Sequence, residues 1–172
     1  MSRIALVSAM HEELAAVLAR MPDEHKTVVA GREFWLGHWH GHEVVAVLSR
    51  IGKVAAATTA TTLIERFGVT RMVFTGVAGG VGDGVLVGDV VVGTSYLQHD
   101  MDASPLFPRY EIPLYGQSVF AGDVDLCGAL QMASDAALAG FRHQGRAPVV
   151  HRGLITSGDR FVNSAAEVAA LV

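Results

Sequence analysis

The chain contains few of the residues that mark several common classes of protein. Its single cysteine, Cys127, excludes a disulfide within the chain and fits a reducing compartment. It has only two lysines and a net charge of −4, so it lacks the clustered positive charge that nucleic acid requires. No apolar run approaches the roughly 18 residues of a membrane span, and the N-terminal run is too short for a signal peptide. We therefore expect a cytoplasmic protein that binds neither nucleic acid nor a membrane.

The composition favours a folded protein. Hydrophobic residues make up 51% of the 172 residues, and charged residues make up 17%. This balance excludes an intrinsically disordered chain and provides enough apolar surface for one globular core. We expect a single domain over residues 1–172.

The chain opens with the pattern of a strand followed by a helix. Residues 3–8 form a short, β-branched apolar run, which predicts a buried strand. Residues 11–21 have apolar side chains at helical spacing, and Pro22 ends the pattern. Ser8 is the predicted N-cap of this helix.

Strands and helices alternate along the rest of the chain. The alternation predicts an α/β protein, a three-layer α/β/α sandwich around a mixed β-sheet. The expected strands cover residues 26–50 (an antiparallel meander), 71–75, 85–96 and 149–156, and the expected helices cover residues 54–67, 123–139 and 164–172.

Glycines crowd into residues 76–84, directly after a predicted strand. A dinucleotide-binding fingerprint would continue into a helix, but here another strand is expected. A Walker A loop is excluded because Val54, and not Ser or Thr, follows Lys53. Two interpretations remain: a tight turn that lets backbones approach closely, or a turn that lines a small-molecule pocket at a strand's carboxyl end.

Two groups of side chains could ligate a metal ion. They are His38, His40 and His42 on an expected strand, and His99, Asp100 and Asp102 in an expected loop. We favour polar surface segments over zinc sites in both cases, because glycines flank the first group and no cysteine joins either. No metal is expected.

Two acids, Glu12 and Glu13, follow the first predicted strand. Helix-terminus electrostatics explain an acid at either position. The alternative is a general base, since a carboxylate at such a turn faces the carboxyl edge of the sheet.

Residues 98–117 form a long expected loop with three prolines and a heavy apolar load. The loop either folds onto its own domain or contacts another subunit. We favour the subunit contact because exposed apolar patches usually mark an interface.

Six segments occur in the order found in one enzyme family. They are SAMHEEL, SRIGKVAAA, TGVAGG, VGDVVVG, QHDMD and SGDRFVN. Together they make the chain resemble the 5′-methylthioadenosine/S-adenosylhomocysteine nucleosidases of the purine nucleoside phosphorylase superfamily. The resemblance implies a nucleoside phosphorylase-like fold, a homodimer, and no metal or organic cofactor. It also implies hydrolysis of an adenosine thioether substrate to adenine and a thioribose, in methionine salvage.

The resemblance assigns roles to residues at matching positions. Glu13 would position the attacking water. The residues that would bind the substrate are Ala9 and Met10 near the water and ribose, Ile51 near the alkylthio group, Ala78 and Gly79 at the ribose and base, Phe161 stacked on adenine, and Val162 at the base edge. The residues that would close the partner subunit's alkylthio pocket are Ala103, Phe107 and Pro113.

Two departures from the family bear on activity. Val77 stands where many members have Ser. The last predicted helix ends on apolar residues at Val172, before the family's Glu that holds the ribose hydroxyls and its Asp that helps protonate adenine. The sequence alone thus suggests a chain truncated at its C-terminus. The alternatives are a phosphate-dependent purine nucleoside phosphorylase, an inactive nucleoside-binding remnant, and a nucleosidase for a futalosine-type conjugate.

Overall fold

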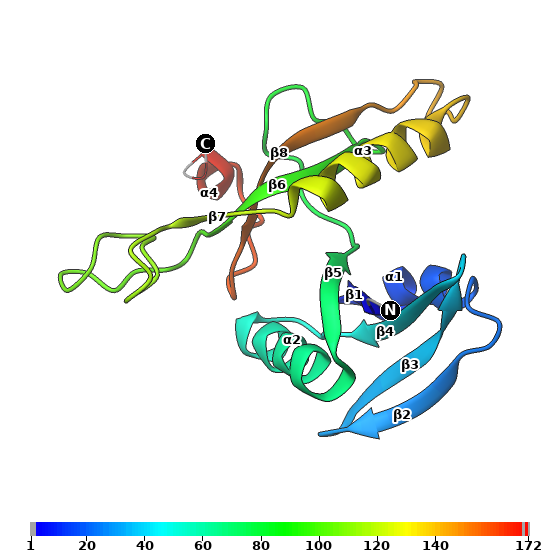
Figure 1. Ribbon diagram of the computed structural model, residues 1–172. Coiled ribbons are helices and arrows are strands. Elements are labelled where there is room, and N and C mark those ends of the chain that lie inside the picture. The colour runs from blue at the N-terminus through cyan, green and yellow to red at the C-terminus, as the bar shows by residue number, and fades with distance from the viewer. Residues whose placement is uncertain (1–2, 170, 172) are drawn as a thin grey trace. The chain divides into compact units, whose positions relative to one another are not determined.

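The computed structural model describes residues 3–169 and 171 and shows two compact units, Met1–Ala78 and Gly79–Val172 (Figure 1). The first unit is built on a five-stranded mixed sheet in the order β2-β3-β4-β1-β5. Strands β4, β1 and β5 run parallel, and β2, β3 and β4 form the expected antiparallel meander. The elements of this unit are β1 (Arg3–Ser8), α1 (His11–Leu18), β2 (His25–Val29), β3 (Arg32–Trp39), β4 (His42–Leu48), α2 (Lys53–Phe67) and β5 (Val69–Phe74).

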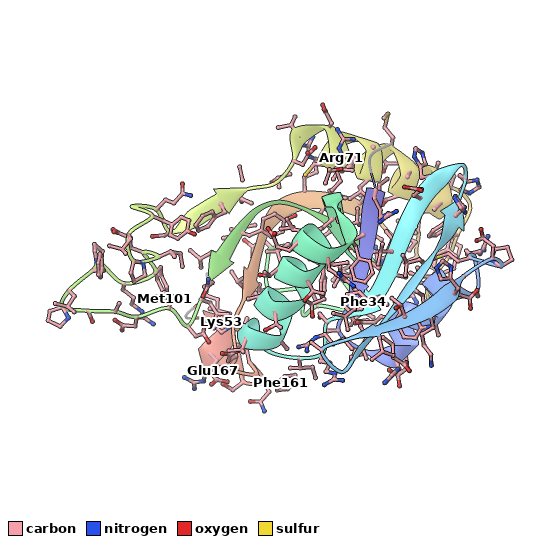
Figure 2. The ribbon with its side chains drawn as sticks, turned by 60° about the horizontal axis from the view of Figure 1, so that its bottom comes forward. Phe34, Lys53, Arg71, Met101, Phe161 and Glu167 are labelled. Atoms are coloured by element: carbon pink, nitrogen blue, oxygen red, sulfur yellow. The ribbon has the colours of Figure 1, made fainter. Side chains whose placement is uncertain are left out.

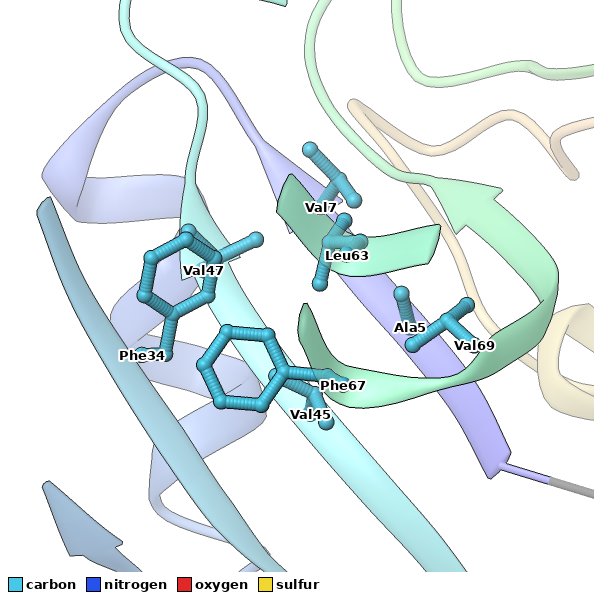
Figure 3. Close-up of a cluster of buried hydrophobic side chains, with 8 residues drawn as sticks. All are labelled: Ala5, Val7, Phe34, Val45, Val47, Leu63, Phe67 and Val69. Atoms are coloured by element: carbon cyan, nitrogen blue, oxygen red, sulfur yellow. The ribbon is translucent and has the colours of Figure 1, made fainter. Parts of the chain in front are cut away.

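Helices cover both faces of this five-stranded sheet. Successive residues of a strand point to opposite faces, so the odd-numbered and even-numbered residues of β4 pack on different helices. On one face, Leu63 and Phe67 of α2 pack on Val45 and Val47, and the Phe67 ring lies 4.6 Å from the ring of Phe34 (Figure 3). On the other face, the buried residues are Leu14, Val17, Met21, Val44 and Ala46, which join α1 to β4. The predicted sandwich of helices around a mixed sheet is confirmed.

The second unit has a three-stranded sheet in the order β7-β6-β8. Strands β6 and β8 run parallel, and β7 is antiparallel to β6. Cys127 of the helix α3 is buried, and its Sγ donates a 3.2 Å hydrogen bond to the carbonyl of Gly93 on β6. The elements are β6 (Val90–Gln98), β7 (Val119–Ala121), α3 (Val124–Leu138), β8 (Val150–Ser157) and α4 (Ala165–Ala169).

The side chain of Asp89 joins the starts of β6 and β8. Its carboxylate is 1% exposed and accepts the backbone N–H groups of Leu86 and Val149. It also contacts Arg146, at 2.7 Å, and Nε2 of His151, at 3.0 Å. Hydrogen bonds from the Val149 and Leu86 amides, followed by His151, hold the pKa of Asp89 far below its usual range.

The structure corrects three details of the predicted elements. Ser8 is not the N-cap of α1, which is Met10. Ser8 is the last residue of β1 and is fully buried, because the strand stays extended through Ser8 and the Ser8 carbonyl accepts the Ser49 amide. The strand expected from residue 85 begins only at Val90, since residues 82–89 form hydrogen-bonded turns. The last predicted helix appears as α4, and its positions 170 and 172 lie outside the described residues.

No helix within the described ranges is long and apolar enough to cross a membrane.

Candidate functional site

In the first unit, three strands end at one edge of the sheet. Because β4, β1 and β5 are parallel neighbours, their carboxyl ends meet there. Hydrogen bonds just past the strand ends join these segments: the Ser49 amide donates to the Ser8 carbonyl, and the Thr75 amide donates to the Val7 carbonyl. The residues that follow each strand therefore lie along this edge, as ligand-binding residues do in open α/β sheets.

The carboxylate of Glu13 links two of these segments. Its Oε2 accepts the backbone amides of Ala9, at 3.0 Å, and Met10, at 2.9 Å. A bond back to the N-cap amide is the usual role of an acid at the third position of a helix. Its Oε1, however, accepts the amide of Val77 at 2.8 Å, and Val77 lies 64 residues away, beyond β5. Helix capping does not explain this second contact.

Gly76 lies directly against the Glu13 carboxylate. A Cβ at residue 76 would lie 2.7 Å from Oε1 of Glu13, closer than real Cβ atoms come, so this carboxylate keeps its position only while residue 76 is glycine. The glycine-rich segment thus includes the close approach that we considered in the sequence, and the group approached is the carboxylate. Whether the same segment also lines a pocket stays a prediction.

Two other predicted residues of this unit follow strands that end at the same edge of the sheet. Ile51 follows β4 and is 80% exposed, and Ala78 follows β5 and is also exposed. Met10 is partly exposed beside Glu13, whereas Glu12 is exposed and takes no part in these hydrogen bonds. Residue chemistry alone did not distinguish the two acids, and the resemblance assigned Glu13. The carboxylate held at the edge is that of Glu13.

A second edge forms in the other unit, where β6 and β8 end side by side. The His99 amide donates to the Ser157 carbonyl at 3.0 Å, and the Asp159 amide donates to Oδ2 of Asp100 at 2.7 Å. Two residues beyond Asp159, the ring of Phe161 is 84% exposed (Figure 2).

A cleft of about 250 Å³ opens beside this second edge. His99, Asp100, Arg160 and Val162 are among the residues that line it. Arg160 forms an ion pair with Glu167 of α4. The backbone amide of Asn163 and the hydroxyl of Ser164, followed by Arg160, hold the pKa of Glu167 below its usual value.

The loop between β6 and β7 carries the three residues predicted to serve a partner subunit. Ala103, Phe107 and Pro113 are half-buried, and the Phe107 amide donates to the Ala103 carbonyl at 3.2 Å within a turn. The loop also exposes large apolar side chains, and Leu114 is 91% exposed. The subunit contact itself stays a prediction.

The three histidines considered as possible metal ligands have other surroundings in the structure. Nδ1 of His38 pairs with Asp23 at 2.8 Å, and His40 lies in the turn between β3 and β4 with a φ of +48°. Hydrogen bonds from the backbone and side chain of His38 lower the pKa of Asp23. Across the part of the chain that the structure describes, no three His, Cys, Asp or Glu side chains form a metal-binding group.

Sequence reasoning missed Gly76, the Val77 amide and the role of Asp100. The sequence did carry a partial signal for the first two, because the glycine segment directly follows a strand parallel to the strand before Glu13. For Asp100, QHDMD gave no indication of which of its side chains would contact the turn after β8.

Comparison with known proteins gives consistent matches. The family model described as the phosphorylase superfamily matches residues 3–172. The 5′-methylthioadenosine/S-adenosylhomocysteine nucleosidase of Psychromonas ingrahamii is 34% identical over 166 residues, which cover 93% of this chain and 66% of that protein. The chain therefore spans slightly less than two thirds of the length of this curated relative.

Solved structures agree with this result. The nucleosidase of the same name from Neisseria meningitidis, in complex with methylthio-immucillin-A, is 34% identical with a TM-score of 0.87, over 98% of this chain and 70% of that one. The nucleosidase from Colwellia psychrerythraea, in complex with adenine, is 33% identical with a TM-score of 0.86, over 98% of this chain and 66% of that one.

Proposed function

Because this chain belongs to the phosphorylase superfamily, we propose that it hydrolyses the N-glycosidic bond of 5′-methylthioadenosine and S-adenosylhomocysteine. The products are adenine and the corresponding thioribose. The names of the relatives and the ligands in their structures support this choice of substrate. The observation that carries the proposal is the Glu13 carboxylate, held by three backbone amides at the carboxyl edge of the sheet.

A carboxylate at this edge favours water over phosphate as the nucleophile. The superfamily includes phosphorylases, which must bind a phosphate anion next to the ribose. A carboxylate would repel that anion, whereas it can accept a hydrogen bond from water and take its proton. This argument disfavours the phosphorylase alternative.

The hydrogen bonds of Glu13 also indicate which oxygen does the chemistry. An ionised carboxylate has about four acceptor positions, and the amides of Ala9, Met10 and Val77 occupy three of them. Two of these amides bond Oε2 and one bonds Oε1, so the remaining acceptor position is on Oε1. A water molecule bound at this position would be oriented by a Glu13 carboxylate that the three amides keep from rotating.

The proposed reaction balances with water as the only co-reactant. The bond between C1′ of the ribose and N9 of adenine breaks, and its electron pair leaves with the base. The water oxygen bonds to C1′, Glu13 takes one water proton and releases it to solvent, and the leaving adenine takes a proton from solvent. No cofactor or metal enters the reaction.

Other residues would bind the substrate. In the first unit, Ala9 and Met10 contact the water and ribose, Ile51 contacts the alkylthio group, and Ala78 lies under the ribose. In the second, Gly79 supports the base, Phe161 stacks on adenine, and the backbone of Val162 reads the base edge. Stacking suits a purine because its π-face is large and apolar.

We further propose that the protein is a cytoplasmic homodimer of methionine salvage. Ala103, Phe107 and Pro113 of one subunit would then close the alkylthio pocket of the other. The half-burial of these residues and the exposed apolar side chains of the same loop support this assembly.

The test is release of adenine from methylthioadenosine, followed by chromatography in phosphate-free buffer and in buffer with phosphate. We expect the same rate in both buffers. Release that requires phosphate would contradict the proposal and assign a phosphorylase. Binding of adenine without any release would assign a nucleoside-binding protein.

A further inference from the structure

The turn that precedes Phe161 and Val162 is held by a side chain from another strand end. Asp100 follows β6, and its Oδ2 accepts the amide of Asp159, which follows β8, at 2.7 Å. The paired strands end at Gln98 and Ser157. The bond from the His99 amide to the Ser157 carbonyl continues this backbone pairing by one step. The Asp100 bond therefore continues the connection past the end of the sheet.

The turn also fits tightly against this side chain. A Cβ at Gly158 would lie 2.7 Å from Cγ of Asp100 and 2.7 Å from Nε2 of His99. Residue 158 can only be glycine while both side chains keep these positions. The hydrogen bond to the Asp159 amide and the close fit against these two side chains therefore both help to hold the turn.

Phe161 has little packing of its own to fix it. Its ring is 84% exposed, and it lies two residues beyond the bonded amide of Asp159. Val162 lines the same cleft as Asp100. The position of Phe161 therefore depends mainly on the backbone of its segment, which Glu167 also holds through Arg160 and the Asn163 amide.

We infer that Asp100 is a positioning residue for the base-binding segment: through the Asp159 amide and the Gly158 contact, it places Phe161 and Val162 for adenine. The inference rests on the proposed function, because that function assigns adenine to these two residues. Asp100 touches the turn and takes no part in bond cleavage.

The experiment compares wild type with Asp100→Ala by two readouts. The first is hydrogen exchange of the Asp159 amide, which should be at least tenfold faster in the variant because its acceptor is gone. The second separates binding from chemistry. The Kd for adenine and the KM for methylthioadenosine should rise about tenfold, with kcat changed less than threefold.

Three further variants make the result specific. Asp100→Asn keeps an oxygen that can accept the amide, so it should recover most of the binding. Asp135→Ala removes an exposed carboxylate from α3 and should leave both readouts unchanged. Gly158→Ala should weaken adenine binding in the wild-type background and have a smaller effect on top of Asp100→Ala, because one of the two side chains that it would strike has then been removed.

The outcomes separate this inference from the proposed function. Unchanged exchange at Asp159, or a loss of kcat with KM preserved, overturns the inference while turnover by wild type upholds the function. If exchange accelerates but wild type neither binds adenine nor releases it, the proposed function fails, and the role of Asp100 in base binding fails with it.

Discussion

The two sheet edges share one local arrangement, a carboxylate bonded to a backbone amide, to which we assign different roles. At each edge, a carboxylate that follows one parallel strand accepts a backbone amide that follows the neighbouring strand: Glu13 accepts from Val77, and Asp100 accepts from Asp159. At each edge, a Cβ added to a glycine, Gly76 or Gly158, would lie 2.7 Å from an atom of that carboxyl group.

The difference between the edges lies in where the carboxylate is anchored. Glu13 belongs to the first turn of α1, and two more amides fix its orientation. Asp100 belongs to a loop, and the segment that it holds carries an exposed aromatic ring. A carboxylate fixed from its own helix suits proton transfer, whereas a carboxylate that fixes another segment suits binding. On the proposed function, variants at the first edge should change kcat and variants at the second should change KM.

The largest expected effect is that of Glu13→Gln. The amide keeps the shape of the side chain but cannot take a proton, and its NH₂ group would face a backbone N–H that now donates to the carboxylate. We expect kcat for adenine release to fall about 10²–10⁴-fold, with adenine still bound. Steady-state kinetics and equilibrium binding of adenine measure the two quantities. A variant that keeps wild-type kcat would remove Glu13 from the chemistry.

Gly76→Ala tests the same edge without changing the Glu13 side chain. The added methyl would push Oε1 of Glu13 from its position. A displacement of about 1 Å costs roughly 10²-fold in rate, so kcat should fall by about that factor with KM changed little. The matched control is Gly128→Ala in α3, where a Cβ meets nothing within 4 Å. Equal losses of kcat in both variants would show that the effect comes from general destabilisation.

Asp89→Asn tests stability in the second unit. At neutral pH the variant should lose several degrees of Tm, because the amide weakens the bonds to Arg146 and His151. The lowered pKa of Asp89 gives the sign of the pH dependence. Its stabilising contribution is complete above the unfolded Asp pKa of about 3.9 and is lost as the pH falls through the lower folded value.

Thermal melts across this pH range provide the measurement for Asp89. Wild type should lose more Tm than the variant as the pH falls below about 4. Asp83→Asn, at an exposed carboxylate in the neighbouring turn, is the control and should resemble wild type. If Asp89→Asn and wild type showed parallel pH dependences, Asp89 would not be the group responsible.

The smallest expected effect is that of Glu12→Gln. Glu12 is exposed and shares only the helix-terminus electrostatics with its neighbour. Its kcat and KM should stay within about twofold of wild type, since surface substitutions rarely perturb a site. A large loss of kcat here would mean that the wrong acid of the pair has been assigned.

The sequence predicted most of the first unit because local and global signals agree there. The apolar run of β1, the helical spacing of α1 and the meander of β2 to β4 each have a clear period, and the structure confirms them. The boundaries were less accurate. Ser8 looked like an N-cap, but its carbonyl accepts the amide of Ser49, 41 residues later and just past the end of β4, which local sequence does not reveal.

The candidate site was predictable in its residue types but not in its contacts. Two adjacent acids look alike in sequence, and only the parallel pairing of β1 with β5 brings the Val77 amide to Glu13. The role of Asp89 was not predicted for the same reason, because its partners Arg146, Val149 and His151 are 57 to 62 residues away. Contacts of this range depend on sheet order, which the alternation of strands and helices does not specify.

On the proposed function, the carboxylate edge of the first unit directs water, and not phosphate, to the ribose. This can be tested by the mass of the sugar that the wild-type protein forms from methylthioadenosine in buffer that contains phosphate. We expect free methylthioribose. Formation of methylthioribose 1-phosphate would contradict it.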